Sequence, residues 1–343
     1  MNKTEIVLGV YGDKKFTEYL SMLLQTCICC NYSGFSVRPI SGIKEIYSDY
    51  DEVLLIIQED AISEIDTCGI SENNVCIART GKLIDEKIAP DMPYFRMNIE
   101  PMITSSEIWL KFINQIRLSK DKINDMGVKY GTDKASVQLL KDKIIFGHDY
   151  LRHYEKIFSP IRNEKIKICE YGCGKGYSLK LWKEYFKKGN VVGVDVNECA
   201  SNYSESRIDV IIGNATDIDV QRKLKNTYSE FEIFIDDASH SWGDIRVTLE
   251  NSWELLAHEG IYILEDICCG SFGAYLDKKP TVYDSQHIFD YVLDRCDILR
   301  MPVDWNPMYN AKYFEQLPYI TRKIESELDE VLIYPGTCVF RKR

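Results

Sequence analysis

Residues 168–186 read ICEYGCGKGYSLKLWKEYF, and this stretch decides how the second half of the chain is expected to fold. A short apolar segment ends at Glu170 and is followed by three glycines at alternate positions, Gly172, Gly174 and Gly176. A segment with helical periodicity begins at the next residue. Glycine adopts backbone conformations closed to other residues and lets a ligand approach the main chain closely. The stretch therefore predicts a strand, a ligand-binding glycine turn and a helix.

An acidic residue follows at the end of the next apolar segment. Residues 190–196 read NVVGVDV, and Asp195 lies about 20 positions beyond the glycines, where an acid accepts hydrogen bonds from ribose hydroxyls. This spacing fits a dinucleotide as well as another cofactor that contains adenosine. A glycine turn followed by an ordinary strand-end aspartate is the structural alternative.

The pattern along the chain predicts an α/β protein with two domains. Beyond residue 118, apolar segments without a polar face alternate with helical segments, as buried parallel strands do. Residues 329–343 predict two strands joined by a Pro-Gly turn. We expect a smaller α/β auxiliary domain at residues 1–118. A second domain at residues 119–343 should hold a mostly parallel sheet, closed by the terminal antiparallel hairpin.

Two segments carry more specific structural expectations. Residues 90–102 contain three prolines and no periodicity, so they are expected to begin a connection between the domains. Residues 244–260 are expected to form a helix that precedes the last parallel strand.

Composition disfavours several classes of partner. The net charge of −11 and the isoelectric point near 5.1 argue against nucleic acid or an anionic membrane. The 12 cysteines show no spacing typical of a disulfide framework, which favours reduced thiols. Charge interrupts the N-terminal segment too soon for a signal peptide, and no apolar run reaches the roughly 20 residues of a membrane span. We expect a cytoplasmic protein with neither a nucleic-acid nor a membrane partner.

Four carboxylates follow two of the predicted parallel strands. Asp236 and Asp237 end one strand, and Glu265 and Asp266 end the next. Ligands of an open parallel sheet sit beyond the carboxyl ends of its strands, where these groups would repel one another unless a cation lies between them. Hard oxygen ligands suit Mg²⁺, with Mn²⁺ or Ca²⁺ as alternatives. Solvated strand-end acids without a metal also remain open.

His240 lies three residues after Asp237, in the loop above the same sheet edge. Histidine can take a proton from a hydroxyl group near neutral pH, especially where a metal ion lowers the pKa of that hydroxyl. His240 is therefore the candidate general base.

The segment EYGCGKG, residues 170–176, resembles the E/D-x-G-x-G-x-G loop of class I S-adenosylmethionine (SAM) methyltransferases. A dinucleotide-binding loop would read G-x-G-x-x-G instead. The resemblance implies a Rossmann-like methyltransferase domain in which the glycine loop lies against the methionine part of SAM. It further implies that Asp195 binds the ribose. Glu170 would organise the loop and bind the cofactor by contacting its ammonium group through water.

The same family resemblance implies contacts to the rest of the cofactor. The segment GNATD, residues 213–217, matches the place of the adenine contacts and implies Asn214 and Asp217, although both residue types are also common in turns. Thr132 and Tyr154 are assigned to the cofactor as residues that line its entrance. A packing role on a helix is the alternative for Tyr154.

Four further segments, in order, narrow the resemblance. They are YGTDKAS (130–136), HDYLRHYEKIF (148–158), IDDASH (235–240) and IYILEDI (261–267). Together they resemble the metal-dependent sugar O-methyltransferases of macrolide biosynthesis, the mycinamicin type. The resemblance implies that Asp237, Glu265 and Asp266 are the metal ligands and that His240 is the general base. Asp236 is assigned to the cofactor and competes with Asp237 for the metal, because catechol-type methyltransferases use an acid at this strand end.

The leading hypothesis is a SAM- and Mg²⁺-dependent O-methyltransferase of natural-product biosynthesis. It would act on a hydroxyl of a sugar or a glycosylated small molecule and release S-adenosylhomocysteine. The alternatives are a related enzyme of the cephalosporin-hydroxylase type and a non-catalytic SAM-binding subunit. The resemblance also implies a homo-oligomer. The sequence identifies neither the acceptor hydroxyl nor the role of the N-terminal domain.

Overall fold

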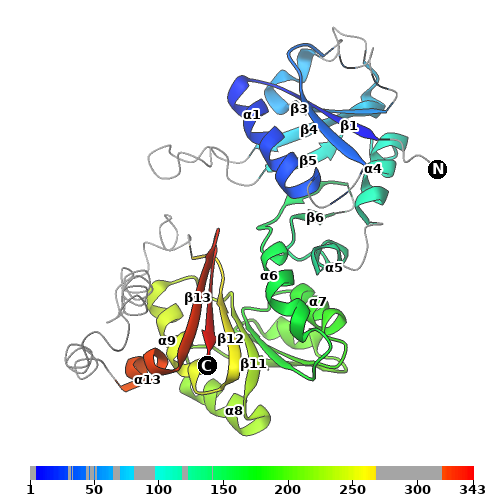
Figure 1. Cartoon of the computed structure of the whole chain (residues 1–343). Coiled ribbons are helices and arrows are strands. Elements are labelled where there is room, and N and C mark those ends of the chain that lie inside the picture. The colour runs from blue at the N-terminus through cyan, green and yellow to red at the C-terminus, as the bar shows by residue number, and fades with distance from the viewer. Residues whose placement is uncertain are drawn as a thin grey trace, which may run out of the picture. The chain divides into compact units, whose positions relative to one another are not determined.

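The computed structural model describes residues 5–29, 32, 34–43, 46, 50, 52–64, 70–80, 97–117, 123–140, 142–267 and 319–343. The chain divides into two compact units, Met1–Ser159 and Pro160–Arg343, and each contains one seven-stranded sheet (Figure 1). Residues 119–159, which the sequence analysis places in the second domain, therefore belong to the first compact unit. The limits of the functional domains stay a prediction.

The first unit combines a parallel sheet with an antiparallel extension. Its strands are β1 (Ile6–Tyr11), β2 (Phe35–Pro39), β3 (Val53–Gln58), β4 (Val75–Thr80), β5 (Met97–Pro101), β6 (Val137–Leu139) and β7 (Ile144–Phe146). Its α-helices are α1 (Lys14–Leu23), α4 (Glu107–Arg117), α5 (Ile123–Tyr130) and α6 (Leu151–Phe158). Shorter helical segments are η1 (Leu24–Cys29, a π-helix), η2 (Glu59–Ala61) and η3 (Glu72–Asn74), and η4 (Ser159–Ile161) lies where the two units divide.

The strand order of the first sheet is β2-β1-β3-β4-β5-β7-β6. The four strands β2, β1, β3 and β4 pair in parallel, as their continuous apolar runs predict, and β5, β7 and β6 pair antiparallel. The expectation for residues 90–102 was wrong in part, because Met97–Pro101 forms β5. This strand alternates buried and half-buried residues, a weaker signal than a continuous apolar run.

The second unit holds the glycine turn and the predicted carboxylates. Its strands are β8 (Lys167–Tyr171), β9 (Asn190–Asp195), β10 (Ile208–Ile212), β11 (Phe231–Asp236), β12 (Leu256–Leu264), β13 (Leu328–Tyr334) and β14 (Thr337–Lys342). Its helices are α7 (Tyr177–Tyr185), η5 (Glu198–Tyr203), α8 (Ile218–Tyr228), α9 (Trp242–Trp253) and α13 (Tyr319–Glu327).

The strand order of the second sheet is β10-β9-β8-β11-β12-β14-β13. The first five strands pair in parallel, and β14 joins β12 and β13 antiparallel. This arrangement confirms the predicted parallel sheet closed by a terminal hairpin. Because β9 and β11 flank β8 on opposite sides, the chain reverses its direction across the sheet at β8, which is where open α/β sheets bind their ligands.

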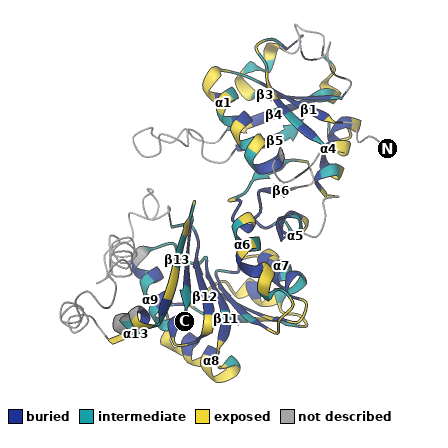
Figure 2. Ribbon diagram, in the orientation of Figure 1, coloured by how far each residue is buried: buried dark blue, intermediate teal, exposed yellow. Residues whose placement is uncertain are grey.

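The two faces of the second sheet are covered by different helices. Apolar side chains of α8, α9 and α13 pack with alternate residues of the strands, including Tyr171, Phe234 and Tyr262. The intervening residues of β8 and β9 face α7, where Trp182 bonds to Glu170 and Leu179 lies beside Gly193. Figure 2 shows that β11 and most of β12 are buried, apart from an exposed position pair within β12. Because side chains alternate between the two faces of a strand, the position of each strand-end carboxylate decides on which face of the sheet it lies.

The helix expected at residues 244–260 ends early. It stops at Trp253, and Leu256–Gly260 already belong to β12. The register between β11 and β12 shifts after Phe231, and Glu259 has a left-handed backbone with a φ angle of 59°. The polar residues of this segment lie at an irregularity of the strand, which helical periodicity does not reveal.

The described cysteines are free thiols: Cys27, Cys76, Cys169, Cys173 and Cys338 are buried, and Cys199 is exposed. Among the described helices, none combines the length and the apolar composition that a membrane crossing requires.

Candidate functional site

The glycine turn after β8 has the left-handed backbone that its residues predict. The φ angles of Gly172, Gly174 and Gly176 are 78°, 49° and 68°. A Cβ atom at Gly172 would overlap the backbone carbonyl of Asp237, and one at Gly176 would lie 2.7 Å from the Tyr203 ring. A Cβ at Gly174 would meet nothing within 4 Å. The turn therefore packs against protein on two sides and presents open space at Gly174.

Asp195 connects this turn to the end of β9. Its Oδ2 accepts a hydrogen bond of 2.7 Å from the Gly174 N–H, and its Oδ1 accepts one of 2.8 Å from the Asn197 N–H. A carboxylate can accept about four hydrogen bonds, so acceptor capacity is left for a ligand. The structure thus brings Asp195 and the predicted cofactor loop together.

Glu170 lies beneath the turn and is fully buried. Its Oε2 accepts a hydrogen bond of 2.8 Å from Trp182 Nε1 of α7. This bond ties the end of β8 to the helix that follows the glycines. The role of Glu170 in organising the loop and its contact with the cofactor stay predictions.

Asn214 and Asp217 lie in the turn between β10 and α8. Asn214 Oδ1 accepts hydrogen bonds from the backbone N–H and the hydroxyl of Thr216, at 3.0 and 2.9 Å. Asn214 thus stabilises the turn, as asparagine commonly does. Asp217 is the residue before α8, and its side chain makes no capping hydrogen bond. Their contact with adenine stays a prediction.

Three predicted residues converge beyond the carboxyl ends of β11 and β12. Nε2 of His240 lies 3.8 Å from Asp237 Oδ1 and 3.6 Å from Asp266 Oδ2. One potential ligand atom from each residue lies within 4.8 Å of the other two, and all three side chains are half-buried. Two carboxylates and an imidazole at these separations can hold one divalent cation.

Two of these residues have unusual backbone conformations. The φ angles of His240 and Asp266 are 54° and 53°, in the left-handed region that non-glycine residues seldom occupy. Such conformations cost about 1–3 kcal/mol each and persist where the surrounding structure holds them, often at functional sites. The cluster therefore coincides with local strain in both of the loops that form it.

Glu265 is more deeply buried than the other two predicted ligands. Its side chain is 1% exposed, and it lies outside the group formed by Asp237, His240 and Asp266. Its backbone N–H donates a hydrogen bond of 3.0 Å to the Asp236 carbonyl. A ligand role for Glu265 stays a prediction.

Asp236 is buried in the face of the sheet covered by α9. Its Oδ2 accepts hydrogen bonds from the Thr248 hydroxyl and, at 2.6 Å, from the Tyr262 hydroxyl. Burial raises the pKa of Asp236, and these two hydrogen bonds oppose that shift. Sequence reasoning missed Thr248 and Tyr262 as partners. The sequence FEIFIDD could have indicated the buried position of Asp236. Side chains alternate between the two faces of a strand, so Asp236 shares the face of Phe234 and Asp237 takes the opposite face.

Thr132 and Tyr154 belong to the first compact unit. Thr132 is 3% exposed and its hydroxyl accepts a bond of 3.4 Å from the Lys134 N–H. Tyr154 is fully buried, and its ring packs against Phe158 with centroids 5.5 Å apart. Tyr154 packs inside the first unit, and the assignment of both residues to the cofactor stays a prediction.

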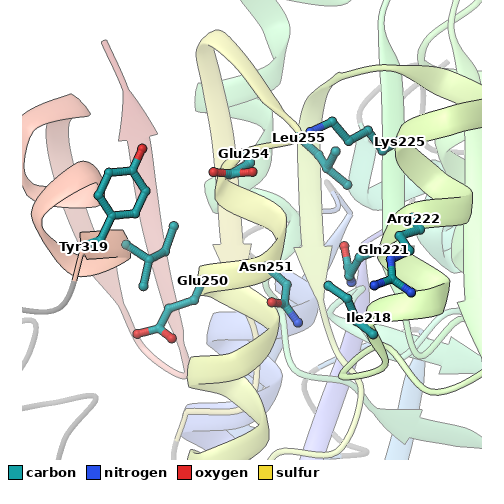
Figure 3. A pocket seen from close by; sticks show the side chains of 10 residues that line it. Ile218, Gln221, Arg222, Lys225, Glu250, Asn251, Glu254, Leu255 and Tyr319 are labelled. Carbon is teal, nitrogen blue, oxygen red and sulfur yellow. The ribbon is translucent and has the colours of Figure 1, made fainter.

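A hollow of about 390 Å³ lies elsewhere on the second unit, between α8, α9 and α13. Figure 3 shows Gln221 of α8 opposite Asn251 of α9, whereas the Glu250 side chain points toward the side where Tyr319 lies. None of the predicted site residues lines it. Three of its charged side chains, Arg222, Glu250 and Glu254, are paired with other side chains, and Lys225 is the fourth charged residue of the lining.

The comparisons with known proteins point to one group of enzymes. The chain is 26% identical over 197 residues to mycinamicin VI 2''-O-methyltransferase from Micromonospora griseorubida. This match covers 54% of this chain and 47% of that protein. It is also 26% identical to demethylmacrocin O-methyltransferase from Streptomyces fradiae, over 52% of this chain and 50% of that protein. The chain is a homologue of macrolide sugar O-methyltransferases. It spans about half the length of these relatives.

Solved structures confirm the predicted fold class. The MycE methyltransferase of the mycinamycin pathway, crystallised with Mg and S-adenosylhomocysteine, matches with a TM-score of 0.51 and 21% identity. The match covers 72% of this chain and 64% of that one. A second crystal form gives a TM-score of 0.50 and 23% identity, over 65% and 55% of the two chains. No family model matches the sequence.

The packing at Gly172 predicts a large and local effect on stability. We expect Gly172→Ala to lower the free energy of unfolding by about 3 kcal/mol or more, because its Cβ would overlap backbone at a left-handed position. Gly174→Ala is the matched control. It carries the left-handed cost of about 1–2 kcal/mol but meets open space. Urea denaturation followed by circular dichroism checks both, and equal losses would contradict the contact at Gly172.

A second prediction concerns Asp149, which precedes α6 in the first unit. Burial raises the pKa of Asp149 to about 6, although Arg152 opposes the shift from 3.0 Å away. A raised carboxyl pKa means that the folded state favours the protonated form, so stability from this group is present below pH 4 and lost as pH rises through 6. Asp149→Asn should therefore stabilise the protein by about 1–2 kcal/mol at pH 7.5 and by much less at pH 4.5.

The measurement is thermal or urea unfolding at both pH values. Asp133→Asn, at an exposed position in the same unit, is the matched control and should show little change at either pH. A stabilisation by Asp149→Asn that is the same at pH 4.5 and 7.5 would exclude the titration of Asp149 as its cause.

Proposed function

We propose that this protein transfers a methyl group from SAM to a hydroxyl of a sugar or glycosylated small molecule, with a divalent metal ion held beside His240. The observation that carries the proposal is the meeting of two predicted elements at one point. The glycine turn contacts the Asp237 backbone at Gly172, and the Asp237 side chain contributes to the cluster with His240 and Asp266. Cofactor loop and metal-binding carboxylates would thus form one site.

The residues around the turn fit an adenosine cofactor. Gly174 leaves open space beside the main chain, and Asp195 retains acceptor capacity while its carboxylate is fixed by two backbone N–H groups. A fixed acceptor binds ribose hydroxyls without losing further side-chain freedom. In the proposed site, the loop backbone lies along the methionine part of SAM and Asp195 binds the ribose.

The cluster fits a hard divalent ion. Mg²⁺ is bound through one or two carboxylates and keeps several water or substrate oxygens, which suits the carboxylates of Asp237 and Asp266. Such an ion, when bound, supplies Lewis-acid chemistry that lowers the pKa of an acceptor hydroxyl and orients it. The sulfonium of SAM supplies an electrophilic methyl group.

The side chains of the cluster supply positioning and proton transfer. Asp237 and Asp266 would bind the metal ion at the carboxyl ends of the strands and so position the acceptor hydroxyl. His240 takes the hydroxyl proton at Nε2 while the acceptor oxygen forms its bond to the methyl carbon and the carbon–sulfur bond breaks in line. The products are a methyl ether, S-adenosylhomocysteine and a protonated His240, which returns its proton to solvent.

The position of His240 fits a second role as well. Its Nε2 lies about as close to Asp266 as to Asp237, so the imidazole can also serve as a third metal ligand. The base and the ligand roles differ in their effect on metal affinity, and mutation of His240 separates them.

The acceptor class is proposed from the relatives. The names of three of them specify O-methylation of mycinamicin VI, demethylmacrocin and a rhamnosyl tetracenomycin. The matches cover 47%, 50% and 41% of these proteins. The sequence resemblance runs from Tyr130 to Ile267 and does not cover the N-terminal domain expected at residues 1–118 or the segment 272–328. That these two regions shape the acceptor site stays a prediction, and residues 268–318 lie outside the described structure. A homo-oligomer stays a prediction.

Removing the fixed ribose acceptor should weaken SAM binding. We expect Asp195→Ala to lower SAM affinity by about 1–3 kcal/mol, the usual loss for a charged hydrogen-bond partner, as measured by calorimetry without metal. Asp209→Ala, on the neighbouring strand β10 where Asp209 bonds to Tyr228, is the matched control and should bind SAM normally. Tight binding of NAD with no binding of SAM would overturn the proposed cofactor.

Replacing His240 tests the proposed chemistry. If His240 is the base, His240→Ala should lower kcat by roughly 10²–10⁴ and leave the affinities for SAM and Mn²⁺ nearly unchanged. The readout is release of S-adenosylhomocysteine with a panel of hexosides and deoxyhexosides. Loss of Mn²⁺ affinity together with activity would assign His240 as a ligand instead.

The controls for this prediction are Asp237→Asn and wild-type protein in EDTA. High Mg²⁺ should restore part of the activity of Asp237→Asn, because its defect lies partly in metal affinity, and none of the activity of His240→Ala. Full wild-type activity in EDTA would eliminate the metal from the proposal.

A further inference from the structure

Asp236 is held by two different structural elements. Its buried carboxylate accepts hydrogen bonds from Thr248 on α9 and from Tyr262 on β12. Its backbone belongs to the last position of β11, paired with Tyr171 of β8 and Leu264 of β12. The side chain is 2% exposed, so these contacts are made inside the protein rather than with a ligand in solvent.

The first of these bonds closes the loop that carries His240. Residues 237–241 connect β11 to α9, and Asp236 stands at the beginning of this loop. Through Thr248, the same residue also holds α9, the helix at the other end of the loop. The loop is thereby closed into a ring from Asp236 through His240 to Thr248 and back. A closed loop has less freedom to relax the left-handed backbone of His240.

The second loop of the cluster is tied to the same residue. The Asp236 carbonyl accepts a hydrogen bond of 3.0 Å from the Glu265 N–H, directly before Asp266. The Tyr262 hydroxyl, 2.6 Å from the Asp236 carboxylate, comes from the strand that leads into this loop. Asp236 therefore contacts both of the chain segments whose side chains form the cluster.

We propose that Asp236 is a positioning residue that holds Asp237, His240 and Asp266 at metal-binding distance through its hydrogen bonds to Thr248 and Tyr262. In this proposal Asp236 does not make the cofactor contact that the sequence analysis expected, but orients the metal-binding residues from inside the protein. The inference rests on the proposed function only in taking the cluster to bind a divalent ion. Partners that orient ligands from behind typically affect metal affinity by about 10–100-fold.

The rest of the buried polar network supplies a matched control. The Ser252 hydroxyl donates to the Thr248 carbonyl at 2.6 Å and lies 2.7 Å from the Tyr171 hydroxyl, which Gln221 contacts in turn at 3.2 Å. Gln221 lines the hollow of Figure 3, away from the cluster. Tyr171 is as deeply buried as Tyr262 and on the same face of the sheet, but its hydroxyl bonds to Ser252 and Gln221.

The experiment measures Mn²⁺ binding to the full chain by electron paramagnetic resonance, with the metal alone as the probe. Tyr262→Phe and Thr248→Val each remove one hydrogen bond to Asp236 with little change in volume. We expect each to weaken Mn²⁺ binding about 10-fold. Thr248→Ser keeps the hydroxyl and should bind within about twofold of wild type. Tyr171→Phe should do the same, although it also removes a buried hydroxyl and lowers stability.

SAM affinity, measured on the same samples, should change little in Tyr262→Phe, Thr248→Val and Thr248→Ser, because the glycine turn and Asp195 are not altered. Unfolding midpoints identify any variant that is not folded at the assay temperature, and Asp236→Asn provides a further replacement that keeps the side-chain volume. Asp236→Asn should also weaken Mn²⁺ binding, since an amide is a weaker acceptor for the two hydroxyls.

The outcomes separate the two proposals. If wild type binds no Mn²⁺, the metal centre of the proposed function fails and the positioning role fails with it. If wild type binds Mn²⁺ and Tyr262→Phe and Thr248→Val bind it equally well, only the positioning role of Asp236 is overturned. Weakening by Tyr171→Phe as large as that by Tyr262→Phe would also overturn it, because the effect would then follow from stability alone.

Discussion

The contact between the backbones of Gly172 and Asp237 is the constraint on which the rest of the site depends. A side chain at position 172 would occupy the space of the Asp237 carbonyl, so glycine is required for β8 and β11 to end side by side. The N–H of Gly172 donates to Val194 at 2.8 Å, and the N–H of Asp237 donates to Tyr171 at 3.0 Å. These bonds join the ends of β9, β8 and β11. The cofactor loop and the carboxylate cluster are thus built on the same three strand ends, at the reversal of strand order.

Four acidic residues at neighbouring strand ends play different structural parts because the strand has a period of two. Asp236 shares the face of Phe234 and is buried against α9, whereas Asp237 lies one position further and joins His240 and Asp266. A buried carboxylate is stable only with hydrogen-bond donors, and Tyr262 and Thr248 provide them. The four carboxylates therefore do not share one site, because Asp236 lies on the other face of the sheet from Asp237 and is hydrogen-bonded inside the protein.

The cluster is formed by loops rather than by regular elements, and this explains its unusual backbone. His240 and Asp266 both adopt left-handed conformations, at a cost that isolated loops would not sustain. The parallel sheet and α9 fix the ends of both loops, and the hydrogen bonds of Asp236 reach each of them. Rigid elements thereby hold the side chains of Asp237, His240 and Asp266 close together beyond the carboxyl ends of β11 and β12. A cation can bind there, and solvent can still enter.

The sequence by itself determined the features that depend on neighbouring residues. The parallel strands of the second unit, the glycine turn, the terminal hairpin and the similarity to methyltransferases follow from local patterns in segments such as 168–186 and 261–267. It did not reveal β5 or the early end of α9, because short alternating strands and strand irregularities carry weak periodic signals. Only the tertiary structure decided that Asp236 bonds to Tyr262 and Thr248, that Asn214 closes a turn, and that Glu265 lies outside the group of Asp237, His240 and Asp266. These outcomes depend on which strands become neighbours and on the face that each side chain takes, and such contacts between distant residues are fixed only when the whole sheet has formed.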